Sequence, residues 1–219
     1  MTFITSGNII NRMLNFIDKI GTKNFGEAVK GYNIRVFNER EVRASAGILF
    51  FFVTIAFFNA LLISNFIYLR VFVIVFFVDF FIRIFINPRY SPMMILGRIF
   101  VQNQKPEYTG APQKKFAWIL GLLLATTMMI LIFVLNVTGI INLSICILCL
   151  AFLFFESVFG ICFGCIAYSK LSSKKPQLCP GNVCEISFKE DVQIIKKEQM
   201  IVLSIFLLFI SIVVYRLLI

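Results

Sequence analysis

The chain has 219 residues, of which 59% are hydrophobic and only 15% charged, and its mean hydropathy is +0.91. A soluble core of this length does not need so much apolar surface, so the composition indicates a membrane protein. The chain contains no histidine, which leaves thiols and carboxylates as the candidate reactive groups. Its net charge of +10 comes from basic clusters that alternate with apolar segments, which favours contact with anionic lipid over nucleic acid as a partner.

The N-terminal region, residues 1–43, is predicted to lie in the cytoplasm. Isoleucine, leucine and methionine recur at helical spacing over residues 8–20, with Ser6 or Asn8 as the N-cap. This pattern predicts an amphipathic helix on the bilayer surface. It does not predict a signal peptide, because no basic stretch is followed by an unbroken apolar core.

Five apolar segments are long enough, or nearly so, to cross a hydrocarbon layer of about 30 Å. They are Ala46–Phe66, Tyr68–Ile86, Phe116–Val137, Ile140–Tyr168 and Met200–Ile219. We expect the first four to form a membrane domain over residues 44–168 and the fifth to be a separate C-terminal helix over residues 200–219. The predicted fold is therefore all-α, a polytopic bundle of four to five transmembrane helices with interfacial helices.

The distribution of charge predicts the orientation of these spans. Basic residues precede the first segment, follow the second, and fill the loop of residues 169–199 between the fourth and fifth. The first connection offers only Arg70, and the turn around Asn136 to Asn142 carries no charge. By the positive-inside rule, the N-terminus and both long loops are predicted to be cytoplasmic.

The stretch after the second segment predicts a helix stop and a restart. It reads Asn87-Pro88-Arg89-Tyr90-Ser91-Pro92. Ser91 is the expected N-cap, with Pro92 at the first helical position. Residues 92–103 are then a short interfacial helix, and an extended linker runs from Gln104 to Gln113. The side chains expected to face lipid are those of Met94, Ile95, Ile99 and Phe100.

Four cysteines gather where the fourth segment meets the lysine-rich loop. Cys162 and Cys165 form a Cys-x-x-Cys motif, and Cys179 and Cys184 follow in the loop. The predicted topology places all four at the cytoplasmic surface, about two helical turns beyond Glu156 for the first pair. Structural disulfides are uncommon in that reducing compartment.

Three interpretations of these cysteines stay open. In the first, Cys162 and Cys165 are a redox pair or a relay that passes sulfur as a persulfide, with Cys179 and Cys184 as resolving thiols and a cytoplasmic thiol or sulfur-carrier protein as partner. In the second, all four hold a structural zinc ion. In the third, the first pair are small residues at a helix contact, beside two glycines.

A further Cys-x-x-Cys pair, Cys146 and Cys149, lies deep in the fourth segment, where plain apolar packing is expected.

Three charged residues interrupt the spans. Asp79 and Arg83 are four positions apart on one helix and can form an ion pair, and Glu156 lies in the fourth segment. Charge in lipid is costly, so we expect all three to face the bundle interior, with Arg83 held between Asp79 and Glu156. The group is either a polar path, as in a transporter for a small sulfur-containing anion, or a structural link between the second and fourth spans.

Other polar residues lie at the cytoplasmic edge. Asn38, Arg40 and Arg43 precede the first span, and Arg89 follows the second. The first three either cap the site formed by the intramembrane charges or extend to lipid phosphates.

Several of these motifs together resemble a known family. They are Asn38-Glu-Arg-Glu-Val-Arg43, Asp79-Phe-Phe-Ile-Arg83 with the following Asn87–Pro92 stretch, and Phe159-Gly-Ile-Cys-Phe-Gly-Cys165 followed by Tyr168. Over about residues 33–185 the chain resembles the bacterial membrane-protein family catalogued as domain of unknown function 4395. The resemblance implies a multi-pass protein of the bacterial inner membrane, and some members are labelled thiosulfate sulfurtransferases. It supplies no mechanism.

Overall fold

A computed structural model describes residues 25–137 and 139–171, Leu178, and residues 197, 200–202, 204–205, 208, 212 and 215. The predicted helix over residues 8–20, and both Cys179 and Cys184, lie outside this described part. The chain divides into two compact units, Met1–Cys184 and Glu185–Ile219. In the second unit, the described residues from 200 to 215 are helical, within the predicted last span.

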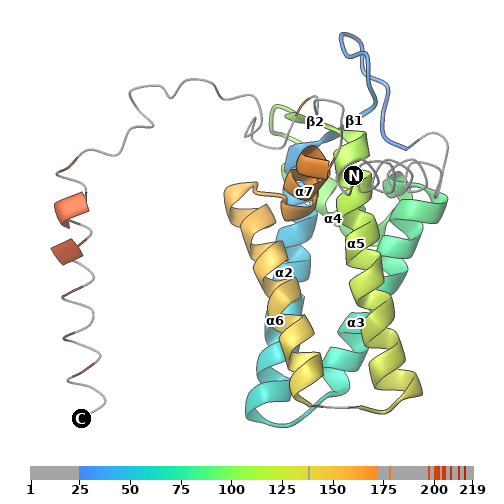
Figure 1. Ribbon diagram of the computed structural model, residues 1–219. Helices are drawn as coiled ribbons and strands as arrows, with labels where there is room; N and C mark the ends of the chain where they lie inside the picture. The colour runs from blue at the N-terminus through green and yellow to red at the C-terminus, as the bar shows by residue number, and fades with distance from the viewer. Residues whose placement is uncertain are drawn as a thin grey trace, which may run out of the picture. The chain divides into compact units, whose positions relative to one another are not determined.

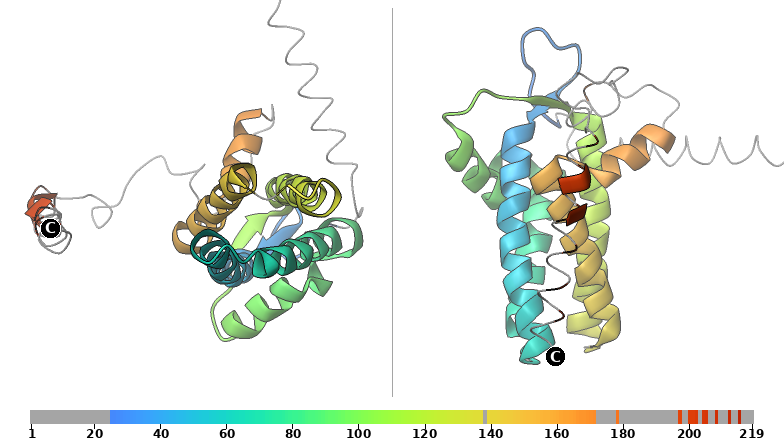
Figure 2. Two further views of the ribbon diagram at one scale, coloured as in Figure 1. Left: turned by 90° about the horizontal axis from the view of Figure 1, so that it is seen from below. Right: turned by 90° about the vertical axis from the view of Figure 1, so that its left-hand side faces the viewer.

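The body of the first unit consists of long helices that run up and down (Figure 1). They are α2 (Glu39–Leu62), α3 (Ile67–Phe81), α5 (Ala111–Met129) and α6 (Ile140–Phe154). The last three each continue into a π-helical turn, which is η1 (Ile82–Ile86), η3 (Ile130–Val134) or η4 (Phe155–Phe159). Short connections join α2 to α3 and α5 to α6 at one end of the bundle (Figures 1 and 2).

Three helices of the described part are long and apolar enough to cross a membrane. They are Glu39–Leu62, Ala111–Val134 and Ile140–Phe159. The helix formed by α3 and η1 is apolar as well, but it carries Arg70, Asp79 and Arg83. The prediction of apolar helices able to span a bilayer is thus confirmed for three of its segments.

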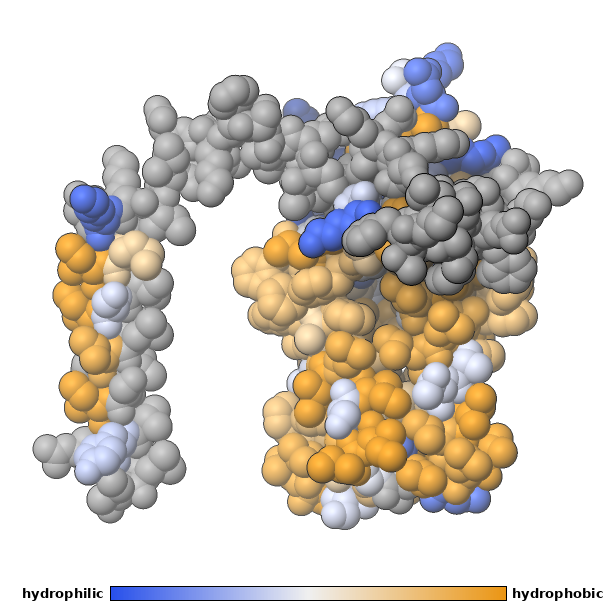
Figure 3. Space-filling model, in the orientation of Figure 1, coloured by the Kyte–Doolittle hydropathy of each residue, from blue (hydrophilic) through white to orange (hydrophobic). Residues whose placement is uncertain are grey.

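The outer surface of these helices is apolar. Large hydrophobic side chains such as those of Phe51, Leu62 and Val134 are exposed, and Figure 3 shows a broad hydrophobic surface below a more hydrophilic upper end. So large an exposed apolar surface is unfavourable in water. Hydrocarbon is the solvent in which such a surface is stable.

The opposite end of the bundle carries the smaller elements, namely β1 (Val36–Asn38), η2 (Pro88–Tyr90), α4 (Pro92–Val101), β2 (Tyr108–Gly110) and α7 (Phe163–Leu171). β1 and β2 pair antiparallel, with Val36 opposite Gly110. The predicted extended linker therefore includes a short strand, which the all-α prediction missed. It also ends earlier than predicted, because α5 begins at Ala111 rather than at Phe116.

The cap of α4 is as predicted. The Ser91 hydroxyl accepts a hydrogen bond from the Met94 amide at 3.2 Å, and Pro92 occupies the first turn. The prediction that Met94 faces lipid is wrong, since α4 packs closely against α2 and buries this side chain. Gly97 permits the approach, because a Cβ there would lie 2.6 Å from the Glu41 carbonyl oxygen. The other three residues predicted to face lipid, Ile95, Ile99 and Phe100, are exposed.

The fourth predicted segment is not one continuous helix. The chain leaves η4 at Gly160, whose φ of 68° is left-handed, and α7 begins at Phe163. Glycine adopts this conformation without a steric penalty, which makes it a common helix terminator. The Arg43 side chain fills the space beside Gly160, since a Cβ on this glycine would lie 3.3 Å from Cζ of Arg43. The break places Glu156 close to the end of its helix, and the following Cys-x-x-Cys motif packs against α5.

Candidate functional site

The Cys162–Cys165 pair forms the first turn of α7. The two sulfurs are joined as a disulfide, with the Cα atoms 5.1 Å apart. The sequence argument against a disulfide rested on a reducing compartment. Locally, the spacing of three residues across one helical turn brings the two side chains to bonding distance. The two cysteines of the other motif, Cys146 and Cys149, are free, and Cys146 is buried in the apolar core, as expected.

The N-terminal end of α7 faces the sulfur of Cys162. This residue precedes the first helical residue, and its Sγ accepts a hydrogen bond from the Cys165 amide at 3.2 Å. An amide donor and the positive end of a helix dipole both favour negative charge at that position.

Gly164 sets the distance between α7 and α5. A Cβ on this residue would lie 2.6 Å from both Cα and Cβ of Ala117, closer than real side chains approach. The glycine between the two cysteines thus allows α7 to rest on α5. The interpretation of this region as a close helix contact is compatible with the redox interpretation, because the same contact positions both sulfurs.

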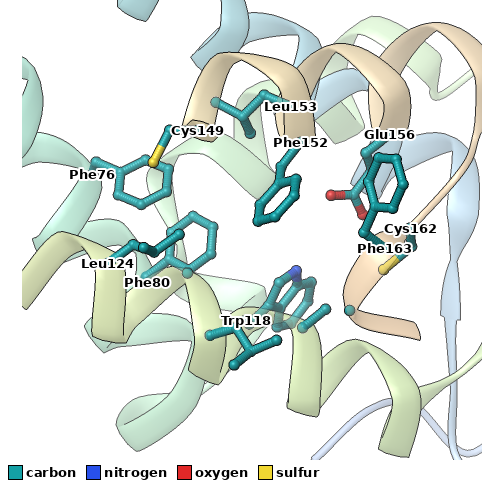
Figure 4. Close-up of a pocket in the computed structure, with 14 residues that line it drawn as sticks. Phe76, Phe80, Trp118, Leu124, Cys149, Phe152, Leu153, Glu156, Cys162 and Phe163 are labelled. Carbon is teal, nitrogen blue, oxygen red and sulfur yellow. The ribbon is translucent and has the colours of Figure 1, made fainter. Parts of the chain in front are cut away.

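A small cavity lies beside the disulfide. Its volume is about 70 Å³, and Figure 4 shows the side chains that surround it. Helices α3, α5 and α6 and the start of α7 contribute to its wall. The residues that define its chemistry are Phe76, Phe80, Trp118, Phe152, Glu156 and Cys162. Cys149 lines the same cavity from α6, so a free thiol and one sulfur of the disulfide border a single apolar space.

Glu156 is held by a lysine that sequence reasoning had placed among the surface charges. Lys114 Nζ lies 2.8 Å from Glu156 Oε1 and 3.0 Å from Glu39 Oε2, and the lysine side chain is fully buried. Sequence reasoning missed both Lys114 and Glu39, because it began the third span at Phe116 and left Lys114 among the basic residues that precede it. Pro112, which favours the first turn of a helix, was the available signal for the earlier start.

Asp79 and Arg83 form a separate buried ion pair. Arg83 Nε and Nη2 both lie 2.7 Å from Asp79 Oδ2, and both side chains are almost fully buried. Asp79 Oδ1 accepts hydrogen bonds from the Ser91 hydroxyl at 2.6 Å and the Met93 amide at 3.0 Å. Arg83 Nη2 also donates to the hydroxyl of Ser45 at 3.4 Å.

The predicted arrangement of Arg83 between Asp79 and Glu156 is wrong. The Asp79 carboxylate links the end of α3 to the N-terminus of α4, where backbone amides favour an anion. Glu156 lies instead against α5 and the start of α2 through Lys114 and Glu39. The intramembrane charges thus form two independent links rather than one.

Trp118 lies between the Asp79–Arg83 ion pair and the cavity. The Arg83 guanidinium lies 5.1 Å from the centre of the Trp118 ring and 4.8 Å from that of Phe80, both distances typical of cation–π contacts. Phe25 and Phe37 pack on the same indole ring, at 5.6 and 5.0 Å between centroids. The orientation of the indole is therefore fixed by its neighbours.

The outer polar residues have partners close to them at the polar end of the bundle. Asn38 is the N-cap of α2, where its side-chain oxygen accepts the Arg40 amide hydrogen. Arg40 pairs with Glu107, and Arg89 lies 2.9 Å from Glu27. The structure gives Asn38 and Arg40 these local partners. The two alternatives for Asn38, Arg40 and Arg43, a cap over the intramembrane charges or contact with lipid phosphates, stay predictions.

Arg43 fastens the end of the fourth helix. Its Nη2 donates to the carbonyl oxygen of Val158 at 3.0 Å, a group that the helix leaves without an intrahelical partner. At the surface nearby, Arg98 donates to Glu41 at 3.0 Å, and this hydrogen bond raises the pKa of the Arg98 guanidinium.

The fold and site define a helical protein with apolar helices of membrane-spanning length and a Cys-x-x-Cys motif at the polar end of the bundle. The chain belongs to the family described as Domain of unknown function (DUF4395), whose model matches residues 37–172. No curated protein and no solved structure matches the chain. The matched range includes both buried ion-pair groups and the Cys162–Cys165 pair.

The zinc site stays a prediction. Among the described residues, no group of three or more cysteine or acidic side chains is placed to hold a metal ion. Two of the four predicted ligands, Cys179 and Cys184, lie outside the described part.

Proposed function

We propose that the protein is a multi-pass protein of the bacterial inner membrane that carries out thiol redox chemistry at Cys162 and Cys165. The observation that carries this proposal is the placement of the pair: the two sulfurs are bonded at the first turn of α7, and Cys162 Sγ accepts the Cys165 amide hydrogen. Such a site favours the thiolate, which is the form that makes and breaks disulfides.

The proposed topology has α2, α3, α5 and α6 crossing the bilayer, with the N-terminus and α7 on the cytoplasmic side. The connections of residues 63–66 and 135–139 carry no charge, whereas basic residues gather at the other end of the bundle, which supports this orientation. A reporter inserted at Lys174 should be cytoplasmic, and one fused after Ile219 should be outside. A reporter at Lys174 that is active outside the cytoplasm contradicts the orientation.

The exchange step needs a thiol partner on the cytoplasmic side. A thiolate of a cytoplasmic thiol or sulfur-carrier protein attacks one sulfur of the Cys162–Cys165 bond, forms a mixed disulfide, and releases the other cysteine as a thiolate. A second thiol of the partner then attacks the partner's own sulfur in this bond, so that the partner leaves with a disulfide and the pair is reduced. Alternatively, Cys179 attacks that sulfur and Cys184 then attacks Cys179, which releases the partner's thiolate and leaves a Cys179–Cys184 disulfide. In sulfur transfer, the Cys162 thiolate attacks the outer sulfur of a persulfide on the carrier protein, which forms a persulfide on Cys162 and releases the carrier's thiolate.

A redox titration tests this proposal. The purified protein is equilibrated with reduced and oxidised dithiothreitol at varied ratios, and free thiols are trapped with a maleimide that adds mass. We expect two thiols to appear together in one transition, which Cys162→Ser abolishes and the control Cys146→Ser keeps. Thiols that stay reduced at every ratio, together with a bound zinc ion found by metal analysis, would favour the zinc interpretation instead.

The transport interpretation receives less support from the geometry. Arg83, the proposed attraction for an anion, already donates to Asp79, Ser91 and Ser45. Uptake of labelled thiosulfate into proteoliposomes that is lost in Arg83→Gln and kept in Cys162→Ser would nevertheless establish transport over redox chemistry.

A further inference from the structure

The sulfurs of the redox pair are shielded from water yet border the cavity. Cys162 is 5% exposed and Cys165 only 2%. A flat small molecule can reach Cys162 through the cavity that this residue lines, without an exposed sulfur. The cavity is thus a second route by which electrons can reach or leave the pair.

The walls of this cavity suit a neutral aromatic ring. Five aromatic side chains contribute to its wall, which are Phe76, Phe80, Trp118, Phe152 and Phe163. A second apolar cavity of about 20 Å³ shares Phe76, Leu124 and Cys149 with the first and continues between the same helices. Rings prefer offset or edge-to-face contact with other rings, so an apolar aromatic molecule is the chemistry that this space favours.

One hydrogen-bond donor is directed into the space. Figure 4 shows the indole nitrogen of Trp118 pointing into the cavity. The residue is only 2% exposed, so the rest of its ring is enclosed by protein. An indole N–H group that points into an apolar cavity is a suitable hydrogen-bond donor for a carbonyl oxygen.

We propose, on the basis of the redox function above, that this cavity binds the ring of a membrane quinone, which takes electrons from the Cys162–Cys165 dithiol. Trp118 donates its indole hydrogen to one quinone carbonyl, and the aromatic walls contact the edge of the ring that carries this carbonyl. A cavity of about 150 Å³ can enclose a benzene ring. The cavity here, at about 70 Å³, therefore takes the carbonyl-bearing edge of the ring, and the remainder and the tail extend between the apolar helices.

The electron transfer balances within these partners. The Cys162 thiolate adds to the ring and forms a carbon–sulfur bond. The Cys165 thiolate then attacks Cys162 Sγ, so that the sulfur–sulfur bond forms, the carbon–sulfur bond breaks, and its electron pair stays on the ring. The two protons released by the thiols complete the hydroquinone. A cytoplasmic dithiol then reduces the pair again.

The test uses full-length protein in lipid nanodiscs, reduced and freed of reductant, with decylubiquinone as the probe. We expect one quinone to be reduced for each disulfide formed, as measured by the loss of quinone ultraviolet absorbance and by thiol titration. Trp118→Phe keeps the ring but removes the donor, and it should raise the half-saturating quinone concentration up to about tenfold, the value of one hydrogen bond. The redox equilibrium between the Cys162–Cys165 pair and dithiothreitol should be the same in this variant as in the wild type.

A second variant tests the same cavity in case Trp118→Phe does not fold. Cys149→Phe narrows the cavity from α6 and should weaken quinone binding, whereas Ile147→Phe on the exposed face of that helix should not. If reduced protein equilibrates with dithiothreitol but does not reduce quinone, or if neither Trp118→Phe nor Cys149→Phe alters the reaction, the quinone site is refuted alone. If equilibration with dithiothreitol also fails, the redox function is refuted with it.

Discussion

Replacing Lys114 by methionine tests the buried charge group at the end of α6. The substitution removes the ammonium group that lies 2.8 Å from Glu156 and 3.0 Å from Glu39. At an effective dielectric constant of about 20, each contact is worth roughly 6 kcal/mol of Coulomb energy. Burial of the ammonium group costs several kcal/mol in return, so the expected loss of stability on removing one partner is about 3–5 kcal/mol.

The assay follows thermal unfolding of the detergent-solubilised protein. A thiol-reactive dye reports the exposure of Cys146, which is buried, and of Cys149, which is partly buried. For a chain of this size, 3–5 kcal/mol corresponds to a melting temperature lower by about 6–20 °C. The exposed Lys105, replaced by methionine in the same way, should leave the melting temperature unchanged.

The reasoning also predicts a coupling between partners. Glu39→Gln combined with Lys114→Met removes one carboxylate together with the ammonium group, so the double variant should recover part of the lost stability. A melting temperature for Lys114→Met equal to that of the wild type would refute the buried ion group. A double variant whose loss of stability equals the sum of the losses in the two single variants would also refute it.

Two further predictions concern other contacts. Asp79→Asn leaves the buried Arg83 without its counter-charge and should destabilise the protein by about 3–5 kcal/mol in the same melting assay, whereas a stability unchanged by this substitution would contradict the burial of the pair. Gly164→Ala places a Cβ 2.6 Å from Ala117 and should displace α7, which slows disulfide formation in a thiol-trapping assay. The control Gly139→Ala, which meets no atom within 4 Å, should form the disulfide at the wild-type rate, and equal rates for both variants would show that the α5–α7 contact does not position the pair.

Local features of the chain could be predicted where neighbouring residues alone decide them. The Ser91 cap followed by Pro92 depends on adjacent backbone, and the Asp79–Arg83 pair needs only the spacing of one helical turn. The partner of Glu156 could not be predicted in this way. It depends on where α5 begins, on the break at Gly160, and on which helices lie beside α6.

The sequence by itself determined the class of protein, since apolar segments of that length are stable only in hydrocarbon, and it singled out the Cys162–Cys165 motif. Only the tertiary structure decided what surrounds that motif. The left-handed turn at Gly160 redirects the chain, and α7 rests on α5 through Gly164. Trp118, Glu156 and Cys162 therefore border one cavity although they come from three different elements, a proximity that depends on packing between helices and not on spacing along the chain.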